Sequence, residues 1–570
     1  MRLLFSEFKE SKNFRFLVIV AALAFIPTIG LVHLFDWDEI NFAESAREMM
    51  ATGDYFQVQV NFSPFWEKPP LFFWLQSLSM HTFGINEFGA RFPNALAGVI
   101  TIIVIYFLGK KEKSERFGTI WALLYLVSFL PQIYFRSAII DPIFNLFIFL
   151  STYYLFKALT EVELKNKRAL WAGIFCGLAI LTKGPVGFLL VFVTFLVFIV
   201  VKKFKILPTF KQFIIFALSV FAVSFLWFGA EVINNGPWFL VEFINYQIEL
   251  FSQGVAGHEQ PFYYHFIVVF LGVFPLSALA LPSLIKRKRD SELEQWWTIL
   301  FWVVMIIFSI ATTKIVHYSS MTYLPLSFLS AIVIHEMKWE EFKKWTRWVY
   351  VFLASFLAIA FAVLPMVGIF NESISPYIKD PFAVAGFNNP DVSWTGFEPL
   401  IAVVFVTGII LFMRFWKEGK LVKALQFKAV LISLTMSLTM IFVVKKIEGY
   451  SQAPMIEFYE DLQGQEVYVS PIGFKSYAQY FYFQQPESPN AHLKMRAEKF
   501  NNEPVLYAPL EQEVKLFLLY GDIEHDAYLV TKIQHEELDN IEYIKLLYTK
   551  GGYKFYKRES VLTESNEVPN

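Results

Sequence analysis

Hydrophobic residues recur in long runs along the first 445 positions of the chain, and short polar segments separate these runs. A run of about 17–25 apolar residues is long enough to cross a bilayer as a helix, and the sequence predicts about thirteen such spans. The predicted spans are residues 16–35, 88–109, 117–135, 139–158, 169–181, 184–201, 212–232, 264–285, 296–311, 317–334, 347–369, 397–415 and 426–444. The run 169–181 is short, and if it is only one arm of a broken helix the topology after it inverts.

The composition agrees with a membrane protein. Hydrophobic residues make up 56% of the 570 positions and charged residues only 17%, which excludes an ordinary soluble domain. A net charge of −1 leaves no basic face of the size that nucleic acid requires. The single cysteine, Cys176, cannot form an internal disulfide.

The polar segments between the runs alternate in their content of lysine and arginine. Most of these basic residues fall in every second segment, namely 1–15, 110–116, 161–168, 202–211, 286–295, 335–347 and 414–428. The positive-inside rule therefore predicts a cytoplasmic amino terminus, thirteen spans and a carboxyl terminus on the outer side. No small-residue cleavage site follows the first run, which predicts an uncleaved span rather than a signal peptide.

The outer segments are poor in charge, yet they contain the unusual ionisable residues of the membrane portion. Ionisable groups at span ends on one side of a membrane indicate a shared site there. The candidates are Asp38, Glu39, Glu67, Lys68, Arg136, Asp141, Lys183, His258, Lys314, His317 and Tyr318. The first outer segment also predicts two juxtamembrane helices at about residues 39–53 and 69–83, the second beginning at a proline pair.

Beyond about residue 446 the apolar runs end, and short segments typical of strands replace them. Strands are predicted at 466–470, 504–507, 526–530 and 554–557, and helices at 474–483 and 511–519. We expect residues 446–570 to form a small α/β domain on the outer side, and its sequence contains no catalytic constellation.

Several ordered motifs are similar to one known family. The segments 38–49, 67–71, 83–93, 182–185 and 258–262 resemble bacterial relatives of the protein O-mannosyltransferases, glycosyltransferase family 39, which include the transferase that adds aminoarabinose to lipid A. The resemblance implies the GT-C fold over residues 1–445, so we expect an all-α polytopic membrane protein with about 13 transmembrane helices and a small C-terminal α/β soluble domain. It also implies transfer of a sugar from a polyprenyl-phosphate carrier to a lipid, glycan or protein acceptor at the outer face of the bacterial inner membrane.

The acidic candidates suit the acceptor side of such a reaction. A carboxylate near the attacking oxygen can act as general base, and Asp38 is the first candidate, with Glu39 and Asp141 as further catalytic candidates. Alternatively, Asp38 caps the helix that follows it, and Asp141 caps its helix or pairs with Arg136.

The cationic candidates suit the donor side, because a departing polyprenyl phosphate gains negative charge. Lys68 and Lys183 lie in the family-like motifs, and Arg136, Lys314 and Tyr318 are further candidates for binding the donor phosphate. Headgroup contact or snorkelling is the alternative for Arg136 and Lys314. The pair His317 and Tyr318 either lines the donor site or is simply polar sequence at the membrane interface.

Glu67 and His258 are candidate ligands of a divalent metal ion, and the resemblance points the same way. Two ligands are fewer than a stable site normally has, so a hydrogen-bond network is the alternative. No other cofactor is expected. His33 and Cys176 are expected to be structural.

Two other functions fit a chain of this composition. A transporter or flippase of lipid-linked sugar would place charges near the middle of the membrane and often shows repeated halves. A non-catalytic membrane scaffold would not require Asp38 or Lys183. The clustering of charge at one face favours a transferase over both.

Overall fold

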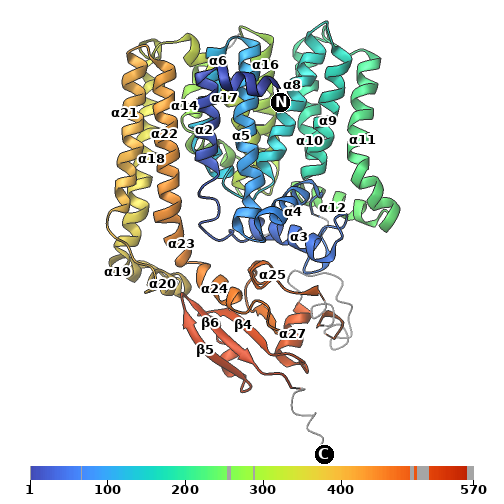
Figure 1. Cartoon of the computed structure of the whole chain (residues 1–570), viewed down its shortest axis with the longest axis vertical. Helices are drawn as coiled ribbons and strands as arrows, with labels where there is room; N and C mark the ends of the chain where they lie inside the picture. Colours follow the sequence, from blue (N-terminus) through green and yellow to red (C-terminus); the bar gives the residue numbers. More distant parts are fainter. Residues whose placement is uncertain are drawn as a thin grey trace, which may run out of the picture.

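The computed structural model describes residues 2–65, 67–252, 259–286, 289–487, 493–496 and 512–561. It has a bundle of upright helices and a smaller part built on a β-sheet, which lies below the bundle in Figure 1. Both parts are needed to describe the candidate site, because residues from each of them line it.

Long apolar helices form the bundle. Within the described residues, seven segments are long and apolar enough to cross a membrane. They are α5 (Glu87–Glu112), α8 (Asp141–Thr160), α11 (Phe210–Asn235), α16 (Glu292–Ile310), α18 (Lys344–Ile369), η5 with α21 (Glu398–Leu400, Ile401–Lys417), and α22 with η6 and α23 (Leu421–Thr439, Met440–Val444, Lys445–Gly449). Helix α13 (Tyr264–Gly272) is followed, after a bend of 101°, by α14 (Leu276–Leu279) and α15 (Leu281–Ile285). Counted together as one bent span, these helices make an eighth segment.

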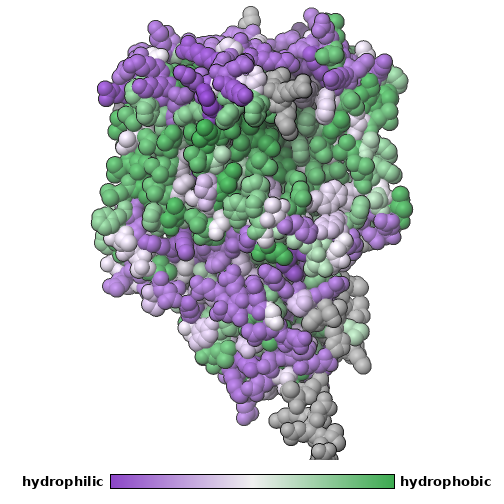
Figure 2. Space-filling view, viewed as in Figure 1, coloured by the Kyte–Doolittle hydropathy of each residue, from purple (hydrophilic) through white to green (hydrophobic). Residues whose placement is uncertain are grey.

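Five further upright helices are too short or too polar for that test. They are α2 (Lys12–Phe25), α6 (Glu115–Leu126), α9 (Lys165–Lys183), α10 (Val186–Val201) and α17 (Tyr323–Glu336). Every apolar run in the sequence therefore contains a helix, while only seven or eight helices satisfy the criterion for crossing. On the face shown in Figure 2, an apolar belt crosses the bundle between two hydrophilic bands, as expected of a multi-pass membrane protein.

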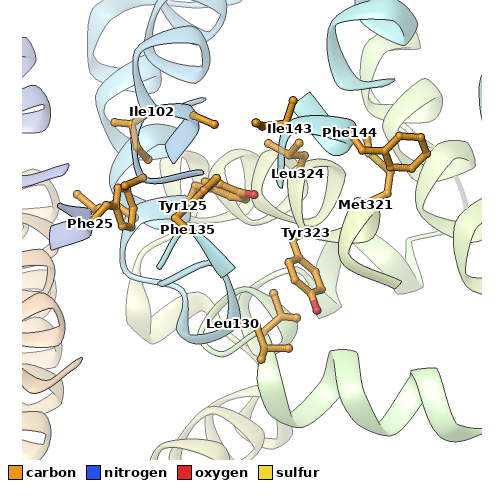
Figure 3. Close-up of a cluster of buried hydrophobic side chains, with 14 of the residues drawn as sticks. Phe25, Ile102, Tyr125, Leu130, Phe135, Ile143, Phe144, Met321, Tyr323 and Leu324 are labelled. Carbon is orange, nitrogen blue, oxygen red and sulfur yellow. The ribbon is translucent and has the colours of Figure 1, made fainter. Parts of the chain in front are cut away.

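The bundle is held together by close helix packing around aromatic and aliphatic side chains. Helix α9 packs against both α8 and α11. A Cβ atom on Gly173 of α9 would lie 2.6 Å from the carbonyl oxygen of Phe216 in α11, so only glycine permits this approach. Figure 3 shows one buried cluster, in which Phe25, Phe135 and Tyr125 join segments far apart in sequence.

Short helices lie across the end of the bundle that faces the sheet. Helices α3 (Asp38–Thr52), α4 (Leu71–Phe83) and α12 (Trp238–Ser252) are found there in Figure 1. The two-residue strands β1 (Gln59–Val60) and β2 (Ser63–Pro64), which pair with each other, lie between α3 and α4 in the sequence. The remaining short elements are α1 (Arg2–Glu10), α7 (Phe129–Tyr134), η2 (Val316–Thr322), η3 (Trp339–Glu341), α19 (Asn371–Ile374), η4 (Ser375–Tyr377) and α20 (Pro381–Phe387).

Helix α3 is buried along almost its whole length, from Glu39 to Met49. The amphipathic pattern of its sequence predicts a polar face in contact with water, and the structure differs because the C-terminal part covers that face. Arg47 donates to Glu44 at 2.7 Å and to the backbone carbonyl of Gln485 at 3.1 Å. The polar face of α3 therefore contacts the C-terminal part instead of water.

The C-terminal part is a four-stranded sheet with helices beside it. The strands β3 (Tyr468–Pro471), β4 (Ala527–Lys532), β6 (Tyr553–Arg558) and β5 (Ile544–Lys550) lie in this spatial order, with β3 and β4 parallel and the other pairs antiparallel. The helices are α24 (Ala453–Asp461), α25 (Ala478–Phe483) and α27 (Gln512–Tyr520), with the turn η7 (Leu538–Asn540). The predicted strand at 504–507 lies outside the described residues, and the edge strand β5 was not predicted from the sequence.

Candidate functional site

Two aspartates begin helices at the same place in the molecule. Asp38 is the first residue of α3 and Asp141 the first residue of α8. The imidazole Nε2 of His317 lies between them, 3.7 Å from Oδ2 of Asp38 and 3.6 Å from Oδ2 of Asp141. The Asp38 side chain is 43% exposed and that of Asp141 only 5%, so the more accessible carboxylate is Asp38.

Lys183 reaches the same place from the last turn of α9. Its Nζ donates to Oδ1 of Asp141 at 2.7 Å and lies 4.8 Å from the centre of the Tyr318 ring. The next residue, Gly184, ends the helix with a φ of +87°, and a Cβ there would lie 2.5 Å from Cζ of Phe243. Glycine is therefore required at the turn that aims Lys183 at Asp141.

The loop before α4 brings a second lysine and a glutamate. Oε2 of Glu67 lies 3.7 Å from Nζ of Lys68 and accepts a hydrogen bond of 2.9 Å from the hydroxyl of Tyr246 in α12. Burial, reinforced by the Glu67 carboxylate, raises the pKa of Tyr246, so its hydroxyl keeps its proton and remains the donor.

These side chains line a cavity of about 140 Å³. Its polar lining contains two aspartates, one glutamate, three lysines, one histidine and three tyrosines, and they come from segments spread from residue 37 to residue 477. A compact cavity with convergent acids and cations is the usual form of an active site.

The C-terminal part contributes Lys475 and Tyr477 to this cavity. The Nζ of Lys475 lies 4.2 Å from the centre of the Trp37 ring, and burial lowers the pKa of this lysine. Asp36 anchors the contact, since its carboxylate accepts a hydrogen bond from the Ser476 hydroxyl and one of 3.1 Å from the Tyr477 amide. Burial raises the pKa of Asp36 to about 6, and these hydrogen bonds partly offset the effect.

An apolar groove of about 540 Å³ opens beside the cavity. Four residues, Lys68, Lys183, Thr313 and Tyr318, line both spaces. The rest of the groove is mostly aliphatic and aromatic, with Leu189, Ile244, Ile248, Ile307 and Phe308 among its lining. A further cavity of about 760 Å³ between α10 and α11 shares Pro185, Phe188 and Ile244 with the groove, so an apolar path runs from the two lysines into the bundle.

Seven of the residues predicted from the sequence line the cavity, three do not, and His258 lies outside the described residues. The structure brings together Asp38, Asp141, Glu67, Lys68, Lys183, His317 and Tyr318. Arg136 is buried elsewhere and donates to Gln132, at 2.7 Å to Oε1. Lys314 donates to the carbonyl of Ala311 at 2.6 Å and lines a separate hollow with Glu259 and Gln260.

Glu39 follows Asp38 directly but points into the protein. It is 3% exposed, and its two carboxylate oxygens accept hydrogen bonds of 3.0 and 2.7 Å from Arg91. The backbone amides of Phe35 and Ala138 also donate to it. This arrangement ties α3 to α5 and to the start of α8, and it leaves no lone pair of Glu39 facing the cavity.

Of the two predicted metal ligands, Glu67 and His258, the structure describes only Glu67. His258 lies outside the described residues, and Glu67 is engaged by Tyr246 and Lys68. Within the described ranges, no group of three or more potential metal ligands includes Glu67. Metal coordination by Glu67 and His258 remains a prediction.

The sequence pattern did not single out Tyr246, Lys475 and Tyr477 as site residues. Tyr246 lies in the middle of α12, and Lys475 and Tyr477 lie in a loop of the C-terminal part without any motif. The local signal that could have indicated Lys475 and Tyr477 as site residues is their close spacing, on either side of Ser476, in the loop after β3.

Comparisons with known proteins agree with the motifs. The family described as dolichyl-phosphate-mannose-protein mannosyltransferase matches residues 67–227. An undecaprenyl phosphate-alpha-4-amino-4-deoxy-L-arabinose arabinosyl transferase of Edwardsiella ictaluri is 27% identical over 338 residues, which cover 58% of this chain and 60% of that protein. A transferase of the same description from Proteus mirabilis is 26% identical over 473 residues, 78% of this chain and 79% of that protein. The resemblance predicted from the motifs is confirmed, although the first of these alignments spans less than two thirds of the relative.

Solved structures show the fold. ArnT from Cupriavidus metallidurans in the apo state has a TM-score of 0.74 at 16% identity, with 95% of this chain and 97% of that chain covered. The form of ArnT bound to undecaprenyl phosphate has a TM-score of 0.72. The archaeal oligosaccharyltransferase AglB from Archaeoglobus fulgidus has a TM-score of 0.51 at 12% identity, with 93% of this chain and 70% of that chain covered. The chain therefore has the GT-C fold.

Proposed function

We propose that this protein is an integral membrane glycosyltransferase that moves a sugar from a polyprenyl-phosphate carrier to an acceptor at the membrane surface. The observation that carries the proposal is the position of Lys68 and Lys183, which line both the polar cavity and the apolar groove. Two cations at the mouth of an apolar groove match an amphiphile with an anionic head and a long hydrocarbon tail.

The donor phosphate binds between the two lysines, and its tail follows the groove along Leu189, Ile244 and Ile248. When the bond between the anomeric carbon and the phosphate oxygen breaks, the polyprenyl phosphate gains negative charge. Lys68 and Lys183 stabilise that charge where it develops. Their positions are fixed by neighbouring aromatic rings and, for Lys183, by Asp141.

The acceptor oxygen forms the new bond to the anomeric carbon and approaches from the side of Asp38. If the acceptor is a hydroxyl, its proton passes to the Asp38 carboxylate, which is the more exposed of the two aspartates. The imidazole of His317 lies between the carboxylates of Asp38 and Asp141, beside the position of the acceptor. If the acceptor is a phosphate group, one of its ionised oxygens forms the new bond, and Asp38 positions the group by accepting a hydrogen bond from its remaining P–OH.

The donor proposed for the first assay is the one that similar transferases are named for, undecaprenyl phosphate carrying 4-amino-4-deoxy-L-arabinose. The acceptor is a lipid A-type lipid, which the resemblance of the sequence motifs suggests. Glycan and protein acceptors are the other candidates. Glu67 and His258 would hold a divalent ion, which would supply positive charge to the donor phosphate.

The proposed membrane topology has thirteen spans, a cytoplasmic amino terminus and the C-terminal part on the outer face of the inner membrane. Its support is the bias of lysine and arginine toward alternate segments and a helix in each of the thirteen apolar runs. In this orientation the cavity opens on the outer side of the membrane. Cysteine accessibility at an introduced position in β5, compared with one in the segment 161–168, tests the orientation, and labelling from the cytoplasmic side at β5 contradicts it.

The test of function is a transfer assay in proteoliposomes with the lipid-linked donor and the lipid acceptor. Mass spectrometry of both lipids follows the sugar, and undecaprenyl phosphate released in equal amount identifies transfer. Glycan and protein fractions are added in parallel as other acceptors. Movement of intact donor across the bilayer without a modified acceptor would instead indicate a transporter.

A further inference from the structure

A second cluster of ionisable side chains lies away from the cavity, where the C-terminal part meets the bundle. It consists of His33 from the loop after α2, Glu87 from the first turn of α5, and Glu460 from α24. One potential ligand atom from each of the three lies within 4.8 Å of the other two. We propose that these three residues bind one divalent transition-metal ion, with Zn²⁺ as the ion to test, and that this ion joins the C-terminal part to the membrane part.

The geometry around His33 is that of a metal-bound histidine. Its Nδ1 forms a hydrogen bond of 2.6 Å with the carboxylate of Glu448, which is 3% exposed. Its Nε2 faces Glu460, with Oε2 of that residue 3.9 Å away. A buried carboxylate on one ring nitrogen fixes the tautomer and turns the other nitrogen toward the ion, as in carboxylate–histidine–metal triads.

The other two ligands are oriented in a similar way. The hydroxyl of Tyr482 donates to Oε1 of Glu87 at 3.1 Å, and the Tyr482 ring meets the His33 ring edge to face. Tyr482 is itself held by the backbone amide of Leu34, which donates to its hydroxyl at 2.6 Å. Glu460 is 41% exposed, so the cluster is open to ions from solution on its side.

The distances suit an ion better than direct contact. At 3.9 Å the atoms Nε2 of His33 and Oε2 of Glu460 are too far apart for a hydrogen bond. Two ligands at about 2.1 Å from a tetrahedral Zn²⁺ lie roughly 3.4 Å apart, which requires only a small side-chain movement here. One imidazole and two carboxylates suit Zn²⁺ or Mn²⁺ better than Ca²⁺ or Mg²⁺, which prefer oxygen ligands alone. Water would complete the coordination.

The charge balance also calls for a cation. Glu87, Glu448 and Glu460 face one imidazole, and in the described part of the chain no lysine or arginine forms an ion pair with any of these three carboxylates. The nearby guanidinium of Arg91 is bound to both carboxylate oxygens of Glu39. An ion at the cluster would neutralise this excess and connect three segments that are distant in sequence.

The binding test uses the full chain in detergent, stripped with a chelator and dialysed against Zn²⁺, with bound zinc measured by mass spectrometry. The Glu67→Gln background removes the other candidate metal ligand, so that the two sites are distinguished. This background is expected to bind one Zn²⁺ per chain. Adding Glu460→Gln, which changes an exposed residue and should not disturb folding, is expected to weaken binding at least tenfold. Adding Glu448→Gln is expected to weaken it about 10-fold to 100-fold through the orientation of His33.

The matched control is Glu457→Gln, which changes another exposed glutamate of α24 whose carboxylate bonds Lys550 at 3.0 Å. It is expected to leave zinc binding unchanged, and zinc is expected to raise the Tm of this control but not that of the Glu460 variant. The proposal is overturned if the Glu67→Gln protein binds no zinc, or if Glu460→Gln in that background binds zinc as tightly as its parent. Either result would leave His33 in a simple ion pair with Glu448 and Glu460.

Discussion

Nζ of Lys183 lies 2.7 Å from Oδ1 of Asp141, although 42 residues separate them in sequence. This ion pair sits where the polar cavity meets the apolar groove, since Lys183 lines both spaces. An arriving donor phosphate would share the Lys183 ammonium with Asp141. The pair therefore has a structural role in the free protein and a proposed catalytic role with donor bound.

These two roles can be separated by a double substitution. Lys183→Ala leaves Asp141, which is 5% exposed, without its cation, so both the Tm and the activity are expected to fall. Adding Asp141→Asn is expected to restore most of the Tm while transfer stays about 10²-fold to 10³-fold below wild type. Thermal unfolding and the transfer assay measure the two effects. Lys167→Ala, at the opposite end of α9, is the control and is expected to change neither.

Asp38 and Glu39 are neighbours with different expected consequences. Asp38→Asn is expected to keep the wild-type Tm and to lose about 10²-fold to 10⁴-fold in turnover, because Asp38 lines the cavity. Glu39→Gln is expected to lower the free energy of unfolding by about 3–5 kcal/mol, because it breaks the buried pair with Arg91. Thermal unfolding and turnover are measured on both variants. Full turnover in Asp38→Asn would remove Asp38 from the proposed role.

The contact between the two parts of the chain is expected to depend on pH through Asp36. Burial raises its pKa to about 6 in the folded protein, from about 3.9 in an unfolded chain. The folded state then binds more protons between these values, so the contribution of Asp36 to stability falls as pH rises from about 4 to about 6 and is level above that.

Asp36→Asn removes this titration and keeps an oxygen that accepts from the Tyr477 amide. The Tm of the variant relative to wild type is expected to rise between pH 4 and pH 6 and to stay constant from pH 7 to pH 8. A thermal unfolding series over this range measures it. A relative Tm that falls with increasing pH would show that the folded-state pKa of Asp36 is lowered rather than raised.

Lys475 provides a test of the C-terminal part in the site. Its ammonium lies at the cavity and packs on the Trp37 ring, so Lys475→Ala is expected to reduce transfer about tenfold with little change in Tm. Lys545→Ala on β5 removes an exposed lysine of the same part and serves as the control. Equal activity of the two variants would mean that Lys475 does not take part in the reaction.

The membrane helices and much of the site could be predicted from the sequence because their signals are local. Apolar runs marked all of the upright helices, and Asp38, Lys68 and Lys183 stood out as ionisable residues at the ends of apolar runs. The seven predicted residues that line the cavity follow from topology, because alternate loops lie on the same side of a membrane.

The remaining features depend on contacts between distant segments. Asp38 and Glu39 are adjacent acidic residues that the sequence does not distinguish. The Glu39 carboxylate points into the protein because it accepts a hydrogen bond from Arg91, 52 residues later. The polar residues of α3 predict a face in contact with water. In the structure the C-terminal part covers this face, and Arg47 donates to the backbone carbonyl of Gln485. His33 was expected to be structural, and the nearness of Glu87 and Glu460 depends on how the two parts of the chain meet.

The central claim is that the lysines at the groove bind a lipid-linked sugar donor for transfer within the cavity. The most direct measurement follows the sugar from undecaprenyl phosphate to the lipid acceptor in proteoliposomes, by mass spectrometry, for wild type, Asp38→Asn and the Lys183→Ala/Asp141→Asn variant. The account predicts modified acceptor and an equal amount of free undecaprenyl phosphate for wild type, and rates for both products that are at least about 100-fold lower in the two folded variants. Wild-type rates in either variant, or donor that crosses the membrane unchanged while no acceptor is modified, would contradict it.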